Sequence, residues 1–300
     1  MNNSRGMALI QALVIVAAIA AVAAALMLRA ETARLRLETR FQADQTALYL
    51  DSGVSLVRAM LNAIPEDSAV HRRQDWANPR SGIEIDGAVL AWTVDDAHGR
   101  FNVNSMNDET AEAQSARDAF LRLAQAQGIS RSVARRMADA LGPDPEARSA
   151  AVPGDPIPLP LADPRQLASI AGSETEAFAQ FLGVVSALPV GAKLNINTAH
   201  EAVLDVLLAD LPSAVRGGIA RRVRRDPVTT VDEFLFWVGE TYSPEIATRL
   251  EGMNLAAVSV RFLVTLEARL DSLRLRRSVV LNRGDAQGRG AVFLSMPETE

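Results

Sequence analysis

An uninterrupted apolar segment near the N-terminus is the strongest constraint on how this chain folds. The 22 residues from Met7 to Leu28 contain one polar side chain, Gln11, and no charged one. A helix of this length rises about 1.5 Å per residue and reaches roughly 33 Å, slightly more than the ~30 Å hydrocarbon core of a bilayer. The segment therefore predicts a single membrane-spanning helix. One alternative is a cleaved secretory signal, but its apolar core is shorter, about 7–15 residues. We rank a second alternative, a buried core helix, below the first.

The chain as a whole has the composition of a folded protein. Hydrophobic residues make up 48% of its 300 residues and charged residues 22%, which excludes a disordered or collagen-like chain. The 31 basic and 36 acidic residues give a net charge of −5, so charge alone gives no reason to expect a nucleic-acid binder. Because there is no cysteine, disulfides, thiolate metal sites and thiol nucleophiles are excluded.

A second helical segment follows the apolar one without a break. From Arg29 to Ile64 there is no proline and a single glycine, Gly53. Apolar residues recur along this segment with the period of an amphipathic helix. They are Leu37, Phe41 and Leu48, followed by Leu50, Val54, Val57 and Leu61. We expect this face to pack on partner helices.

The N-terminal residues resemble the processing site of type IV pilins and type II secretion pseudopilins. A basic residue and a glycine directly precede the apolar helix, in the order Arg5-Gly6-Met7-Ala8-Leu9-Ile10. The resemblance implies that a prepilin peptidase cuts between Gly6 and Met7 on the cytoplasmic side and methylates the new N-terminus. Gln11 then occupies the fifth mature position, where these families usually carry Glu.

Lack of that glutamate is a feature of one pseudopilin class, the type II secretion system protein K family. In a filament the glutamate is expected to pair with a neighbouring subunit's N-terminal amine, and an unpaired carboxylate in lipid costs about 2.5–3.5 kcal/mol. A subunit at the filament tip has no neighbour ahead of it. The resemblance also places most of the chain in the periplasm, although the four arginines between Arg29 and Arg40, taken alone, favour the cytoplasm.

Alternating residues in two distant regions predict an antiparallel sheet. Asp86-Gly87 between apolar runs is a strong signal for a two-residue hairpin, and apolar residues alternate from Leu90 to Val94. Downstream, the alternation from Val260 to Ala268 predicts a strand that turns near Asp271. Further strands are expected over Leu273–Leu281 and Ala291–Met296.

The residues between the two halves of this sheet contain an internal repeat. Residues 100–105, Arg-Phe-Asn-Val-Asn-Ser, recur as residues 193–198, Lys-Leu-Asn-Ile-Asn-Thr. Each copy opens a helical stretch. We expect the repeated asparagines to bond to local backbone rather than to a ligand; they are Asn102, Asn104, Asn195 and Asn197. Thr198 and Glu201 have the spacing of a capping box, so Thr198 is expected to cap a helix over residues 199–209.

These features predict an α+β fold in which one domain is inserted into another. The expected order is a leader (1–6), a transmembrane helix (7–28), its amphipathic continuation (29–64), a small pilin-like sheet (65–97 and 255–300) and an inserted helical domain (98–254). We expect a duplicated, SAM-like, all-α insertion with halves 98–142 and 165–254 and a proline-rich linker 143–164. A helical insertion and motifs like those at 99–106 and 194–199 are similar to features of the protein K family.

No cofactor and no catalytic site are predicted. The chain lacks an Asp-x-Asp-x-Asn-Gly calcium loop, so calcium is kept only as a weak alternative to solvated loop residues. Its candidate ligands are Asp95, Asp96 and Asp108. The three histidines lie far apart in the sequence, and no zinc-protease, nucleophile-elbow or phosphate-loop motif occurs.

The main rival interpretation is a membrane-anchored DNA-binding protein of the competence type. Residues 195–199, Asn-Ile-Asn-Thr-Ala, also begin its helix-hairpin-helix domain. That domain needs a glycine-rich hairpin whose backbone N–H groups approach a phosphate. Here the hairpin position reads Asp210-Leu211-Pro212-Ser213-Ala214, and the proline removes one donor. The arginines from Arg216 to Arg225 are expected to form a solvated helix face.

The sequence is therefore identified as a minor pseudopilin of a type II secretion system. The resemblance implies a place at the tip of a periplasmic pseudopilus, which the subunit nucleates or caps for protein export across the outer membrane. The implied partners are I- and J-type minor pseudopilins, the prepilin peptidase and the inner-membrane assembly platform, with no nucleic acid. The implied location is the inner membrane, crossed once, with a cytoplasmic N-terminus.

Overall fold

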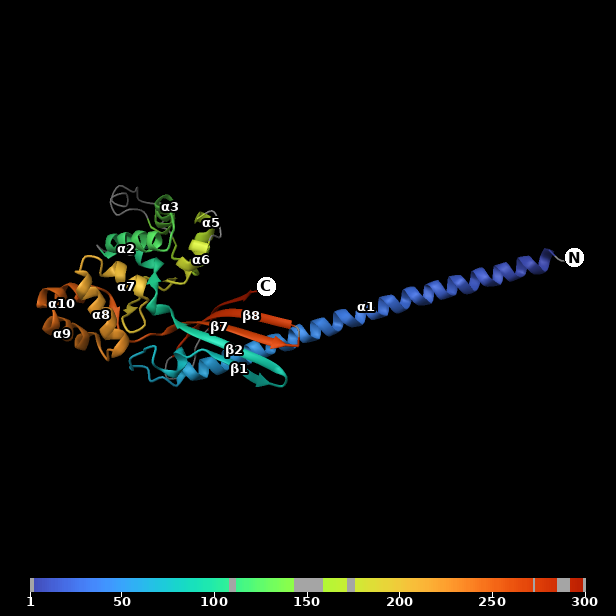
Figure 1. Ribbon diagram of the computed structural model, residues 1–300, viewed down its shortest axis with the longest axis horizontal. Helices are drawn as coiled ribbons and strands as arrows, with labels where there is room; N and C mark the ends of the chain where they lie inside the picture. The colour runs from blue at the N-terminus through green and yellow to red at the C-terminus, as the bar shows by residue number, and fades with distance from the viewer. Residues whose placement is uncertain are drawn as a thin grey trace.

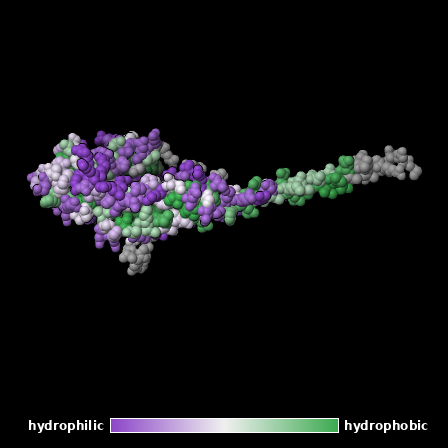
Figure 2. Space-filling model, turned by 60° about the horizontal axis from the view of Figure 1, so that its bottom comes forward, coloured by the Kyte–Doolittle hydropathy of each residue, from purple (hydrophilic) through white to green (hydrophobic). Residues whose placement is uncertain are grey.

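A long helix, α1 (Asn3–Asn62), projects from a head formed by the rest of the chain (Figure 1). The computed structural model describes residues 3–107, 112–142, 159–171, 176–271, 273–284 and 292–298. From Leu13 onward, α1 is long and apolar enough to cross a membrane, and its most apolar window is not buried against the rest of the chain. Figure 2 shows apolar residues along the projecting part of this helix and polar ones near the head.

A five-stranded antiparallel sheet packs on the C-terminal part of α1. The strand order is β1-β2-β7-β8-β9. The strands are β1 (Arg80–Ile85), β2 (Ala88–Asp96), β7 (Arg261–Leu270), β8 (Leu273–Asn282) and β9 (Val292–Glu298). Asp86, Gly87 and Asp271 have φ values of 47°, 86° and 51°, as two-residue hairpin turns require. The predicted α+β class and both hairpins are confirmed.

The central pair of this sheet joins two distant segments of the chain. β2 and β7 pair from Ala88–Leu270 to Asp96–Phe262. All of residues 97–260 lie between their neighbouring ends. The helical part of the head therefore starts and finishes at the same end of the sheet.

The two apolar runs of α1 lie on different faces. Because each residue turns the helix by about 100°, Leu50 lies roughly 220° around from Leu37. Leu50, Val54, Val57 and Leu61 are at most 6% exposed and form one core with the sheet. The expectation that these four pack on partner helices is wrong, because their partner is the sheet of the same chain. Leu37, Phe41 and Leu48 remain 64–69% exposed.

Helices occupy most of the chain between β2 and β7. The first group is α2 (Glu112–Ala126), α3 (Arg131–Leu141), α5 (Ala168–Ala171) and α6 (Glu176–Leu182). The second is α7 (Glu201–Leu207), α8 (Ser213–Arg225), α9 (Val231–Thr241) and α10 (Pro244–Glu251). Short 3₁₀ helices in the same region are η2 (Ala97–Gly99), η3 (Val103–Asn107) and η4 (Pro164–Leu167), whereas η1 (Asp75–Ala77) precedes β1. One core surrounds Phe120 and Phe181, and another surrounds Ile219 and Phe234.

The inserted region is not entirely helical. β3 (Phe101–Asn102) pairs in parallel with β4 (Val185–Ser186), and β5 (Leu194–Asn195) pairs in parallel with β6 (Leu255–Ala256). In both cases the strand at the start of a repeat motif pairs with the segment that follows the next helices. The all-helical expectation missed these short strands. Most of the predicted linker, residues 143–158, lies outside the described residues.

Two leucines on opposite faces of α1 test this packing. Replacing Leu50, which is 2% exposed, with Ala should lower the free energy of unfolding by about 2–5 kcal/mol, since it removes core contacts and leaves a cavity. Replacing Leu48, which is 64% exposed, with Ala should change it by no more than about 0.5 kcal/mol. Denaturant unfolding of the full chain in mild detergent measures both. Equal losses would mean that the assigned core face is wrong.

Candidate functional site

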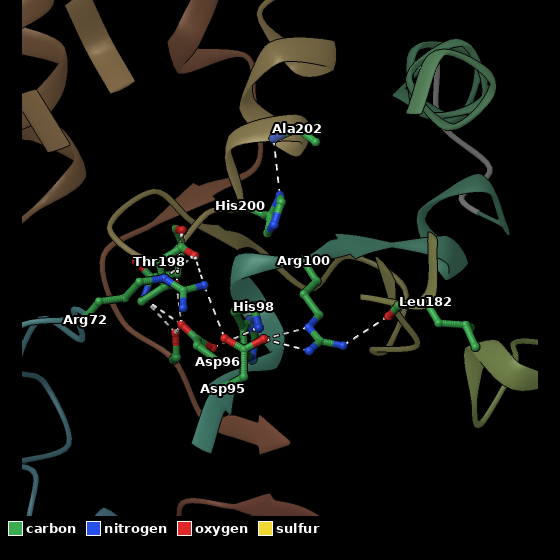
Figure 3. A network of polar contacts seen from close by, with 11 residues as sticks. Arg72, Asp95, Asp96, His98, Arg100, Leu182, Thr198, His200 and Ala202 are labelled. Carbon is green, nitrogen blue, oxygen red and sulfur yellow. Dashed lines mark hydrogen bonds and ion pairs between the residues drawn. The ribbon is translucent and has the colours of Figure 1, made fainter. Parts of the chain in front are cut away.

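A cluster of polar side chains lies where the chain leaves and re-enters the sheet (Figure 3). It joins the end of β2, the second repeat motif and the residues just before β7. These segments approach one another because β2 and β7 are neighbours in the sheet. The cluster fixes the helical region to the sheet.

Asp96 lies at the centre of this cluster and is fully buried. Its Oδ2 accepts hydrogen bonds from Thr198 Oγ1 at 2.5 Å, Ser259 Oγ at 2.6 Å and Asn195 Nδ2 at 3.0 Å. Its Oδ1 accepts from the backbone N–H of His98 at 2.9 Å. One carboxyl group therefore connects β2 to both the second motif and the approach to β7.

Burial raises the pKa of the Asp96 carboxyl above its usual value. The hydrogen bonds from Ser259 and Thr198 and the nearby His98 ring oppose this rise without cancelling it. A raised pKa means that this carboxyl keeps its proton up to a higher pH in the folded state. The folded protein therefore binds this proton more tightly than the unfolded chain.

Asp95, the next residue, forms the outer layer of the cluster. Its Oδ2 accepts a hydrogen bond from Arg100 Nε at 2.8 Å, and its Oδ1 forms an ion pair with Arg72 at 3.2 Å. The Arg72 guanidinium also donates to the Thr198 carbonyl at 2.9 Å, and that of Arg100 donates to the Leu182 carbonyl at 3.2 Å. These two arginines connect the sheet to the 65–79 loop and to both helical groups.

The backbone at Gly99 fits tightly against the second motif. A Cβ at this position would lie 2.4 Å from the Thr198 carbonyl oxygen, so only glycine is accommodated here. The Gly99 carbonyl accepts the His200 N–H at 2.8 Å. His98 Nδ1 lies 2.9 Å from the Lys193 carbonyl and must carry the proton, because a carbonyl only accepts.

The repeated asparagines have structural roles, as predicted, but they reach further than the local turn. Asn102 Oδ1 accepts from the Asn104 N–H, and Asn195 Oδ1 accepts from the Asn197 N–H. Asn104 pairs with both backbone groups of Leu161, at 2.9 and 2.8 Å. Asn197 pairs with both groups of Val228, also at 2.9 and 2.8 Å. In each half, the amide of the second asparagine therefore makes the two hydrogen bonds that the backbone of a neighbouring strand would otherwise make.

The predicted capping box is not present. α7 begins at Glu201, and its N-cap is His200, whose ring accepts from the Ala202 N–H at 3.3 Å. Thr198 lies too early to cap the helix and donates to Asp96 instead. Glu201 forms an exposed ion pair with Arg224 at 2.9 Å.

The candidate calcium ligands do not fit a calcium ion. Ca²⁺ takes six to eight oxygen ligands, whereas N–H donors point at both oxygens of Asp96. Asp95 is held by two arginines. No group of three or more His, Cys, Asp or Glu side chains suited to a metal occurs among the described residues. The third candidate, Asp108, lies outside them.

The predicted processing residues lie in the first turns of α1, which includes Gly6, Met7 and Gln11. They are remote in sequence from the junction cluster, and the structure does not bring the two groups together (Figure 1). The processing prediction therefore depends on the sequence resemblance.

The helix hairpin between α7 and α8 lacks the features of a phosphate-binding loop. Its Pro212 is the N-cap of α8 and makes no side-chain cap bond. Gly217 and Gly218 lie inside α8, and a Cβ on Gly218 would collide with the Tyr242 hydroxyl. The glycines therefore serve helix packing. Two of the α8 arginines are paired, Arg222 with Asp226 and Arg224 with Glu201.

Sequence reasoning missed the role of Asp96, although the pattern contained a signal. The alternation that places Leu90, Trp92 and Val94 on the buried face reaches Asp96 two residues later. A carboxylate in register with a buried face must have internal partners. Ser259 and Arg72, which lie far away in sequence, gave no such signal.

Comparisons with known proteins agree with the resemblance seen in the sequence. A protein-family model described as type II secretion system (T2SS), protein K, matches residues 99–190. A type II secretion system protein K from Pseudomonas aeruginosa is 26% identical over 246 residues, 74% of each chain. One from Klebsiella pneumoniae is 26% identical over 315 residues, 96% of this chain and 94% of that protein.

The fold is similar to a chain in a solved complex. The crystal structure of the GspK-GspI-GspJ complex from the type 2 secretion system of enterotoxigenic Escherichia coli matches with a TM-score of 0.67 and 20% identity. The match covers 88% of this chain and 100% of that one. The predicted fold is confirmed by this likeness.

The raised pKa of Asp96 predicts an unusual dependence of stability on pH. Its favourable contribution is complete below the unfolded-state value of about 3.9 and is lost as pH rises through the higher folded-state pKa. Asp96→Asn does not titrate, and its amide faces an N–H donor in either orientation. The variant should therefore unfold at a lower temperature, and this deficit relative to wild type should shrink as the pH rises above the unfolded-state value of about 3.9. A deficit that grows with pH would contradict the assignment.

Proposed function

We propose that this chain, which belongs to the type II secretion system protein K family, is the minor pseudopilin at the tip of a periplasmic pseudopilus. The observation that carries the proposal is the position of the helical region. It extends past the end of the sheet that is far from the start of α1 (Figure 1). A subunit approaching from that end meets the helical region before it reaches the sheet. The role is therefore to start the filament and to close it.

The anchoring of the subunit follows from α1. The helix is a single-pass membrane anchor by its length and composition. We propose that it crosses the inner membrane with a cytoplasmic N-terminus and that most of the chain is periplasmic. Prepilin peptidase would cut between Gly6 and Met7, and the assembly platform would then move the subunit into the filament.

The proposed partners are the I- and J-type minor pseudopilins. The solved complex that this fold resembles contains GspI and GspJ beside GspK. Leu37, Phe41 and Leu48 are exposed on the face of α1 that the sheet leaves free. We propose that this face packs on the partners' helices, because apolar side chains aligned along one helix face are stabilised when a partner removes them from water.

The role is mechanical rather than catalytic. Most polar groups of the junction cluster are used in internal hydrogen bonds, while Asp95 Oδ1 and His98 Nε2 are buried without one. His98 and His200, which the fold brings to this cluster, both contact backbone. Neither retains the paired acid and base that catalysis would need.

Removing the helical insertion tests the capping role. A chain lacking residues 98–254 keeps the segments of α1 and all five strands of the sheet, and the remaining residues between β2 and β7 can bridge neighbouring strands. We expect longer pseudopili and reduced secretion, measured by electron microscopy and by assay of exported protein. The truncated chain must first be shown to accumulate in the membrane. Filaments of normal length with normal secretion would rule out the capping role.

The processing step has a separate test. Gly6→Ala should leave the N-terminus uncut, because the added methyl group blocks the backbone approach expected at the cleavage site. Intact-mass spectrometry of the membrane-extracted protein distinguishes the two forms, and Ser4→Ala is the matched control that should be cut. A wild-type protein that begins at Met1, or beyond Leu28, would refute the processing prediction.

A further inference from the structure

The surface between α9 and α10 contains an apolar notch that the proposed function does not use. Leu235, Phe236, Gly239, Pro244 and Ala247 line it, and it offers a volume of about 420 Å³. Phe236 is 72% exposed, more than any other aromatic side chain among the described residues. The notch therefore presents a large apolar side chain to solvent.

Phe236 is not needed for the core of its own domain. Its neighbours Phe234 and Val238 are at most 2% exposed and anchor α9 in that core. Two residues correspond to about 200° of helical rotation, so Phe236 lies on the opposite face. An exposed aromatic side chain on a well-anchored helix is the kind of residue that supplies binding energy in protein interfaces.

The floor of the notch is made by small residues. A Cβ on Gly239 would lie 3.6 Å from the Cβ of Ala247, which is ordinary van der Waals contact between the two helices. Gly239 and Ala247 both line the notch together with Phe236. The notch can therefore accept one apolar side chain of a partner next to the Phe236 ring.

The charged residues around the notch indicate which charge a complementary partner would carry. These rim residues are all acidic: Asp232, Glu240 and Glu251. None of these three forms an ion pair with a residue that the structure describes. Lysine or arginine side chains beside the apolar group would complement this rim.

The position of the notch argues against the membrane-proximal part of α1, from a second copy, as its occupant. α9 and α10 lie at the end of the head farthest from the start of α1 (Figure 1). Residues 29–41, a basic and apolar stretch of α1, lie beyond the opposite end of the sheet. A sheet strand of ten residues alone spans about 33 Å between these ends, so a copy anchored in the same membrane cannot bring that stretch to the notch.

We propose that the notch between α9 and α10 docks a segment of another protein in which an apolar side chain is flanked by lysine or arginine. The apolar side chain fills the space over Gly239 and Ala247 and packs on Phe236. The basic residues pair with the three rim carboxylates. This proposal goes beyond the tip position and does not depend on it. Any partner on the same side of the membrane as the head can reach this surface.

Site-specific crosslinking in cells tests the proposal. The photoreactive residue p-benzoyl-phenylalanine replaces Phe236 in the full chain, and the same residue at Asp205, an exposed site on α7, is the control. We expect an adduct from position 236 with at least about tenfold higher yield than from position 205, and its crosslinked peptide should contain lysine or arginine beside an apolar residue. No adduct, an adduct with this same chain, or a crosslinked peptide without basic residues would overturn the proposal.

Two further variants separate the charge and shape contributions. Asp232→Asn with Glu240→Gln and Glu251→Gln should lower the adduct yield about tenfold, because the rim no longer attracts the basic segment. Ala247→Met should lower it similarly by filling the notch, whereas Asp205→Asn should leave it unchanged. Circular dichroism should show the same helical content in all variants. Unchanged adduct yields in folded variants would contradict the proposed docking in the notch, whatever the outcome of the filament and processing tests.

Discussion

The pairing of β2 with β7 is the interaction on which the rest of the structure depends. It brings Asp96 and Phe262 opposite each other across the sheet. Everything between them must leave and return within one strand spacing, about 4.8 Å. The Asp96 cluster uses this proximity, because the His98 N–H just after β2 and the Ser259 hydroxyl just before β7 both donate to one buried carboxyl group. The helical region is therefore fixed to the sheet by a network that is satisfied only when both ends of the excursion are in place.

The second determinant of the fold is the repeated use of asparagine. In both halves, one asparagine closes a two-residue turn and the next pairs with both backbone groups of a distant residue. An amide side chain offers two N–H donors and a carbonyl acceptor, so it can pair with both the N–H and the C=O of one residue. Each motif can therefore organise a helical half with only a two-residue strand. Buried amides of this kind cannot be replaced by apolar residues without leaving backbone groups unpaired.

Much of this architecture could be predicted from local patterns. The Asp86-Gly87 turn, the alternation in the later strands and the unbroken helical period of α1 are all properties of neighbouring residues. What failed were inferences that needed the third dimension. Thr198 fits a local capping pattern but donates to Asp96 instead. Leu50 lies roughly 220° around the helix from Leu37 and packs on the sheet of its own chain rather than on a partner helix. The junction cluster combines residues from four distant segments, and no local pattern specifies such a combination.

The long separation between β2 and β7 also has a consequence for how the protein is made. β2 is synthesised well before its central partner, and at about 5–20 residues per second the delay is on the order of 10–30 seconds. During this time the strand has an unpaired edge, and the apolar face of α1 that ends at Leu61 is uncovered. Contacts this far apart in sequence form slowly, and unpaired edges promote aggregation. The newly made chain therefore has a defined period of vulnerability, and a chaperone that covers β2 would be most useful until residue 270 has emerged.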